Sequence, residues 1–202
     1  MTPDNGGVSG RGERTIVRIL KEAVTLLAFV CTLGLTGAVA QRVFVNPSPQ
    51  AHFQMLFPSA ATFSSKEGDP PVFKAYAVDP KADPSASPLG YIFWTPELLP
   101  TEHGYHGPIH LLVGMDRAGL LTGVVVDYHS EPYGYFSVEP PEFAQQFKGK
   151  SVRDPFKVGG DIAAVSRASL TMNSAARAVR EASRTVARAS LPPDAVRRGA
   201  AG

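Results

Sequence analysis

The chain has 202 residues, with 20 Lys and Arg against 18 Asp and Glu and a single cysteine. A net charge of +2 creates no strong basic field, so composition gives no support to nucleic-acid binding. The lone Cys31 excludes an internal disulfide, a four-cysteine zinc site and a cysteine-ligated iron–sulfur cluster.

The first 40 residues have the pattern of a membrane anchor. A basic N-terminal stretch, residues 1–22, precedes a run of uncharged and mostly apolar residues, 23–40. Such a run is near the lower length limit for a transmembrane helix, and the basic flank favours a cytoplasmic N-terminus. We therefore expect one transmembrane helix, with the rest of the chain outside the cytoplasm. A cleaved signal peptide, which would give a secreted protein, is the alternative, because Ala38-Val39-Ala40 suits a peptidase.

Residues 41–90 have the composition of an irregular linker with short strands. Turn-forming sequences recur there, namely "NPSPQ", "GDPP" and "DPKADPSASP". The segment "VFKAYAV" (72–78) alternates like a strand. The segment "LGYIFWTPELLP" (89–100) predicts a second strand that runs into a loop.

A β-hairpin is the strongest local prediction. Residues 109–116 and 120–131 are rich in Val, Leu and Ile, and Gly119 suits a positive-φ position in the turn between them. The segment "PPEFAQQFKG" (140–149) then predicts a short helix that begins at a proline and ends before Gly149. Its two phenylalanines lie on one face: Phe143 and Phe147.

A long helix is predicted over residues 171–190, ending before Pro192-Pro193. Apolar residues recur in it every seven positions, beside alanines: Met172, Val179 and Val186. A second stripe is basic: Arg177, Arg180, Arg184 and Arg188. A solvated face accounts for such a stripe, and an anionic partner or membrane headgroup is the alternative. Residues 191–202 are predicted to be a disordered tail.

Three hydroxyl residues stand at the start of this helix, Ser166, Ser169 and Thr171. One such residue is usually an N-cap, which accepts a hydrogen bond from a backbone N–H group. Three hydroxyl residues are more than the capping of one helix end requires. The N–H groups and dipole of a helix start also attract anions, and Arg167 could clamp a phosphate with its forked guanidinium.

Two further groups of residues are candidate sites. Four histidines offer ligands for zinc or copper: His103, His106, His110 and His129. The spacing of the first three suits a metal only on a helix, and the glycines and proline of "HGYHGPIH" exclude a helix, so we expect no metal site. The aromatic residues of "HSEPYGYF" (129–136) either pack beneath a loop or form a wall for a flat ring.

Residues 104–181 present these pieces in an order that resembles the FMN-binding domain of extracytoplasmic flavoproteins. The resemblance rests on a Gly-Pro-Ile strand start, the hairpin, "FAQQFKGK" and the hydroxyl residues. Such domains occur in the flavin subunits of the Rnf complex and of the sodium-pumping NADH:quinone oxidoreductase. "SEPYGYF" and "VSRAS" look closest to the nitrous-oxide-reduction regulators and their organohalide-respiration relatives. We expect an α+β fold over residues 91–190, with a twisted, mainly antiparallel sheet and packed helices.

The family's motif is an acidic residue, any two residues, Ser or Thr, Gly, Ala, and a final Thr or Ser that carries FMN through a phosphoester bond. A flavin transferase forms this bond from FAD with magnesium. The motif corresponds here to residues 163–169, so the resemblance implies that Ser169 carries the flavin. It also implies two sets of contacts: Ser166, Arg167, Ala168 and Thr171 for the phosphate and ribityl group, and His129, Glu131, Pro132 and Tyr133 for the ring. Ala163 replaces the usual acidic residue, and Arg167 the usual glycine.

We expect an electron carrier rather than a self-sufficient enzyme, because no acid–base pair or nucleophile–His arrangement indicates substrate turnover. A bound flavin would supply the redox chemistry. The expected partners are a flavin transferase and a membrane redox protein or quinol. Ala163 indicates one alternative, a binding or sensory module of the same fold without flavin. The other alternative is a metal-binding protein that uses the four histidines.

Overall fold

The computed structural model describes residues 49–193. Five strands form one antiparallel sheet in chain order: β1 (Thr62–Phe63), β2 (Phe73–Tyr76), β3 (Gly90–Trp94), β4 (His110–Asp116) and β5 (Leu121–Tyr128). Helices accompany the sheet: α2 (Gln50–Leu56), α3 (Thr95–Leu98), α4 (Gly134–Ser137), α5 (Pro141–Gln145) and α6 (Ser169–Ser190). The predicted α+β class with an antiparallel sheet is confirmed. The predicted transmembrane segment, 23–40, lies outside the described residues, and no helix within 49–193 is long and apolar enough to cross a membrane.

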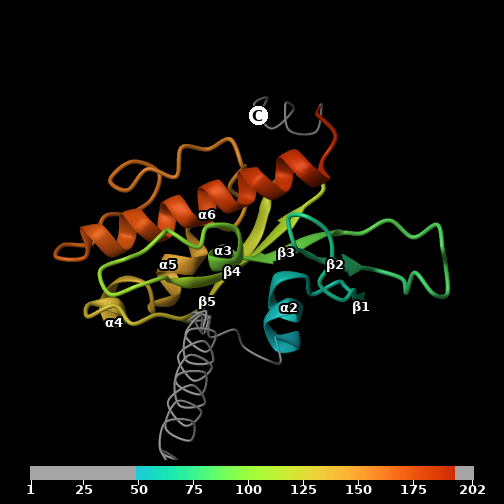
Figure 1. The fold of residues 1–202 in the computed structure, drawn as a ribbon, viewed down its shortest axis with the longest axis horizontal. Helices are drawn as coiled ribbons and strands as arrows, with labels where there is room; N and C mark the ends of the chain where they lie inside the picture. The colour runs from blue at the N-terminus through green and yellow to red at the C-terminus, as the bar shows by residue number, and fades with distance from the viewer. Residues whose placement is uncertain (1–48, 194–202) are drawn as a thin grey trace, which may run out of the picture. The chain divides into compact units, whose positions relative to one another are not determined.

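Both faces of the sheet are covered by helices (Figure 1). Alternate residues of β3 therefore join different clusters: Tyr91 and Phe93 belong to the core that includes α6, whereas Ile92 and Trp94 belong to the core that includes α2. Side chains of a strand alternate between its two faces, so a strand covered on both sides has no polar alternation. This explains why every residue of β3 is buried.

Helix α6 covers one face with the predicted apolar stripe, because Met172, Val179 and Val186 are completely buried. The helix ends at Ser190 as predicted but begins at Ser169, two residues earlier than expected. Ser169 is therefore the first residue of the helix and not part of the preceding loop.

The hairpin and the short helix are also confirmed. Strands β4 and β5 pair antiparallel, and Gly119 has φ +78° in the turn between them. Helix α5 is shorter than predicted, since only residues 141–145 are helical. Its two phenylalanines, Phe143 and Phe147, are buried with ring centroids 5.2 Å apart.

The sequence did not predict α2, α3 or α4. Helix α2 lies in the segment predicted to be irregular, and Phe53 and Leu56 of α2 are buried against the sheet. Seven residues are too few for a helix to be stable by itself, so this helix depends on the sheet face that it covers. Strands β1 and β2 pair with the rest of the sheet, so residues 50–90 are part of the same folded unit.

Candidate functional site

The start of α6 has no cap. Ala168 occupies the N-cap position, and no side chain accepts a hydrogen bond from the first turn. The backbone N–H groups of Ser169, Leu170 and Thr171 donate to no acceptor within residues 49–193. The dipole of this 22-residue helix adds positive potential at the same place. The arrangement suits an oxyanion such as phosphate.

The hydroxyls of Ser166 and Ser169 are not used as caps, so the ordinary interpretation of these serines is wrong. Both residues are exposed, and neither hydroxyl is hydrogen-bonded to another residue in the described range. Thr171 differs from them, because it is buried and donates its hydroxyl to Glu131. Ser169 is thus the hydroxyl that is both accessible and located in the first turn of α6.

Arg167 adopts a left-handed backbone conformation, with φ +68°. This conformation is costly for a residue with a side chain and easy for glycine. Glycine, which the motif of the resembled family has at this position, would adopt the conformation without strain. In this chain an exposed arginine adopts it.

Glu131 lies at the centre of the region. Its side chain is buried, with 7% of the residue exposed. One carboxylate oxygen accepts the N–H of Tyr105 at 2.8 Å, and the other accepts the N–H of His106 at 3.0 Å. The Thr171 hydroxyl is a third donor. Glu131 therefore connects the loop before β4 to the first turn of α6.

The three donors determine the ionisation of Glu131. Burial alone would raise the pKa of this carboxyl, but the hydrogen bonds from Thr171, His106 and Tyr105 outweigh it, so the pKa lies below its ordinary value. The carboxylate is therefore charged at neutral pH. Gly104 approaches it so closely that a Cβ there would lie 2.5 Å from the Glu131 Oε1 atom.

His129 supports the segment that carries Glu131. Its Nδ1 accepts the N–H of Glu131 at 3.1 Å, and its Nε2 lies 3.1 Å from the Glu139 carboxylate. Because Nδ1 accepts, the proton of the neutral ring must be on Nε2. Gly134 packs directly on the imidazole, where a Cβ would overlap the ring.

Large apolar side chains remain exposed on the segments that Glu131 brings together. Tyr105 is 64% exposed on the loop, and Leu170 is 52% exposed in the first turn of α6. Tyr133 and Tyr135 are also exposed, at the start of α4, which contacts α6. Exposed aromatic residues gathered at one place are typical of a binding surface for a ring or a partner.

Residues 104–184 match the FMN-binding domain family. The match supports FMN as the cofactor. No curated protein matches the chain.

The residues present fit FMN. The free N–H groups of the α6 start suit the phosphate of FMN, and the exposed aromatic residues suit its ring. Of the ring contacts predicted from the resemblance, Pro132 and Tyr133 are exposed, whereas Glu131 faces inward and holds the loop. Among the phosphate contacts, Ser166, Arg167 and Ser169 are exposed and Ala168 is buried.

The acidic residue near the FMN motif has another role in this chain. Asp161 accepts the N–H groups of Phe156 and Lys157 and pairs with the ammonium group of Lys150 at 3.1 Å. Ala163 occupies the usual acidic position, and its N–H donates to the Gln146 Oε1 atom at 2.6 Å. Asp161 therefore stabilises the 156–161 turn and does not substitute for the missing acid.

The histidines do not converge. His103 lies against the Pro100 carbonyl, His106 against the Ser130 carbonyl, and His110 edge-on against Tyr128. Within residues 49–193, no group of three or more His, Cys, Asp or Glu residues could hold a metal ion. The metal-binding alternative therefore has no support in this part of the chain.

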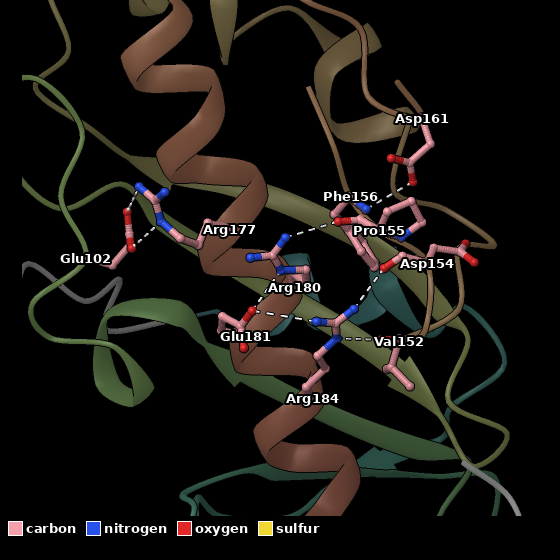
Figure 2. A network of polar contacts seen from close by, with 10 residues as sticks. All are labelled: Glu102, Val152, Asp154, Pro155, Phe156, Asp161, Arg177, Arg180, Glu181 and Arg184. Atoms are coloured by element: carbon pink, nitrogen blue, oxygen red, sulfur yellow. Dashed lines mark hydrogen bonds and ion pairs between the residues drawn. The ribbon is translucent and has the colours of Figure 1, made fainter. Parts of the chain in front are cut away.

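Three arginines of the α6 stripe are held by contacts with other residues (Figure 2). The fourth, Arg188, is exposed. Arg177 makes two hydrogen bonds with Glu102, of 2.8 and 2.9 Å. Arg184 donates to the carbonyls of Val152 and Asp154, at 2.9 and 3.1 Å. These three arginines therefore fasten two loops to the helix. Sequence reasoning missed this role because the acceptors lie 30 or more residues away along the chain.

Proposed function

We propose that the protein is a membrane-anchored, extracytoplasmic electron-transfer protein that carries FMN on Ser169 through a phosphoester bond. The observation that carries the proposal is the uncapped start of α6, with the exposed Ser169 hydroxyl in its first turn. This turn lies within the region that matches the FMN-binding domain family. Its position in the motif is the position of the flavin-bearing hydroxyl in that family.

The attachment step transfers a flavin mononucleotide group from FAD to Ser169. The Ser169 oxygen forms a bond to the phosphorus atom on the riboflavin side of FAD. The bond between this phosphorus and the oxygen that bridges the two phosphates breaks. AMP leaves with the electron pair, and the serine proton is released to a base. A magnesium-dependent flavin transferase supplies the catalytic groups, so this chain needs only an accessible acceptor and a favourable phosphate site.

The residues around Ser169 have distinct roles in the proposal. The N–H groups of the first turn and the Arg167 guanidinium stabilise the phosphate charge. The exposed tyrosines Tyr105, Tyr133 and Tyr135 cover the apolar surface of the ring and exclude water. Once bound, the flavin accepts and donates one or two electrons.

The proposal places the domain outside the cytoplasm, anchored by residues 23–40, with a membrane redox protein or quinol as its partner. It describes a carrier and not an enzyme with its own substrate. A finer assignment to the nitrous-oxide-reduction or organohalide-respiration branch rests on the resemblance of "SEPYGYF" and "VSRAS" to that branch.

Intact-protein mass spectrometry tests the attachment. The chain is co-expressed with a flavin transferase, exported and denatured. We expect a mass increase of one FMN less one water in the wild type and in Ser65→Ala, and no increase in Ser169→Ala. Ser65 is the control, because it is an exposed serine outside the motif and the candidate site.

Three results would contradict the proposed attachment at Ser169. An increase that persists in Ser169→Ala would move the attachment to another residue. A wild-type protein without the increase that is nevertheless yellow would indicate non-covalent FMN. A colourless wild type would instead favour the flavin-free module that Ala163 suggests.

A further inference from the structure

We infer that Glu131 is the positioning residue of the flavin site: its buried carboxylate holds loop 104–106 and the first turn of α6 in one arrangement. The inference rests on the proposed function, because these two segments carry Ser169 and part of the exposed aromatic surface. It assigns Glu131 a role beneath the site, in place of the contact with the ring that the resemblance implied.

The contacts of Glu131 join segments that are far apart in sequence. Its partners Tyr105 and His106 lie 26 and 25 residues before it, and Thr171 lies 40 residues after it. The same loop has a second attachment at His106, whose carbonyl accepts the Ser130 hydroxyl at 3.3 Å. That contact holds the loop only to its neighbour, whereas Glu131 also reaches α6.

A second tie between this region and α6 is located one turn further along the helix. Glu102 accepts the Ser174 hydroxyl at 2.8 Å and pairs with Arg177. Arg177 is about half exposed, so solvent weakens that ion pair. Glu131 is buried and contacts the first turn itself, where the free N–H groups lie. It therefore controls the position of the attachment turn more directly than Glu102 does.

A carboxylate is the side chain that the three donors require. Two backbone N–H groups and one hydroxyl point at the two oxygens of Glu131. A glutamine would place an NH₂ group where one oxygen now accepts, so at least one backbone N–H would face another donor. Leaving a buried donor without an acceptor is costly, so the loop would detach.

The effect of Glu131 on the site is separable from the stability of the fold. Helix α6 remains fastened by its buried residues further along the helix, Val179 and Val186, which belong to the core. Loss of the Glu131 contacts should therefore loosen the loop and the first turn while the sheet and the rest of α6 stay folded.

Four variants test the inference by hydrogen exchange in the flavin-free protein. In Glu131→Gln, we expect amide exchange at Tyr105 and His106 to become about tenfold faster or more, with a clearly smaller change in β3 and β4. Thr171→Val should accelerate exchange at Met172, whose N–H group donates to the Ala168 carbonyl in the first turn of α6. Thr171→Ser should behave as wild type because it keeps the hydroxyl. Glu142→Gln is the control, an exposed glutamate on α5.

The same variants are then loaded with FMN by the transferase. Glu131→Gln should lower the flavin-bearing fraction at a fixed time about fivefold or more and shift the flavin reduction potential. Thr171→Ser and Glu142→Gln should change neither. Normal exchange and normal loading in Glu131→Gln would overturn the inference, as would exchange that accelerates equally in the loop and in the sheet.

The two proposals fail in different ways. A wild-type protein that acquires no FMN overturns the proposed function, and the role of Glu131 as a tie is then decided by hydrogen exchange alone. A wild type that loads normally while Glu131→Gln shows wild-type exchange, loading and potential leaves the proposed function intact and removes the positioning role.

Discussion

At the scale of single residues, Arg167 shows how one backbone conformation is kept against the preference of its side chain. The residue has φ +68°, a left-handed conformation that the family motif normally gives to glycine. An arginine at this position raises the free energy of the folded state, because its Cβ atom disfavours the left-handed conformation. It also places a positive charge two residues before the free N–H groups of the α6 start.

Replacement of Arg167 by glycine should separate these two effects. We expect Arg167→Gly to raise the free energy of unfolding by about 1 kcal/mol, because it removes the left-handed strain. Urea unfolding followed by circular dichroism measures the change. Arg167→Ala is the control, since it loses the charge but keeps the Cβ atom, and it should give no gain. Equal gains in both variants would attribute the cost to the charge.

At the scale of elements, α6 has three functions along its length. Its first turn provides the candidate phosphate site, and its buried stripe completes the core. Its arginines fasten the loops on its exposed side (Figure 2). Arg180 pairs with Glu181 and donates to the Pro155 carbonyl at 3.2 Å, which adds to the contacts of Arg184 with the same loop.

Loss of Arg184 should therefore destabilise the fold. In Arg184→Ala the carbonyls of Val152 and Asp154 lose their donors, and we expect the free energy of unfolding to fall by about 1–3 kcal/mol. Arg184→Lys should recover less than half of the loss, because lysine lacks the forked donors. Arg188→Ala, an exposed arginine one turn later, should change the value by less than about 0.5 kcal/mol. Similar losses at both positions would show that the arginines act only through net charge.

At the scale of the whole molecule, three carboxylates hold the fold together: Glu102 and Glu131 connect distant parts of the chain, and Asp161 holds a local turn. The Arg177 guanidinium lowers the pKa of Glu102 against the effect of partial burial, and the Ser174 hydroxyl adds to the lowering. Partial burial would raise the pKa of Asp161, but the hydrogen bonds from the Lys157 N–H and from Lys150 outweigh it. With Glu131, these groups are all easier to protonate in the unfolded chain than in the fold.

The protein should therefore lose stability in acid. A carboxyl whose pKa is lowered by folding contributes stability above its pKa in the unfolded chain, and the contribution disappears as the pH falls through its pKa in the fold. For these three groups we expect a declining free energy of unfolding from about pH 5 downwards. Urea titrations between pH 3 and pH 7 measure the decline, and Glu102→Gln should make it shallower. An unchanged slope in that variant would show that Glu102 does not contribute.

Much of the fold follows from local patterns. The β4–β5 hairpin, the pair Phe143 and Phe147, and the buried stripe of α6 could all be predicted, because alternation and helical spacing depend on neighbours in sequence. Helix α2 could not be predicted, because its short apolar pattern is meaningful only against the face of a sheet assembled from later residues. The first residue of α6 was missed by two positions, since Ala168 gives no capping signal.

The sequence by itself determined the β4–β5 hairpin, the long helix α6, the resemblance to the FMN-binding family and the candidate Ser169. Only the tertiary structure decided which hydroxyl is free, that Glu131 faces inward, that the histidines separate and that the arginines hold loops. The physical reason is distance along the chain. The partners of Glu131 lie 25 to 40 residues away, and hydrogen bonds between residues so far apart do not produce a repeating pattern in the sequence. Such contacts are determined by how the sheet and α6 pack together.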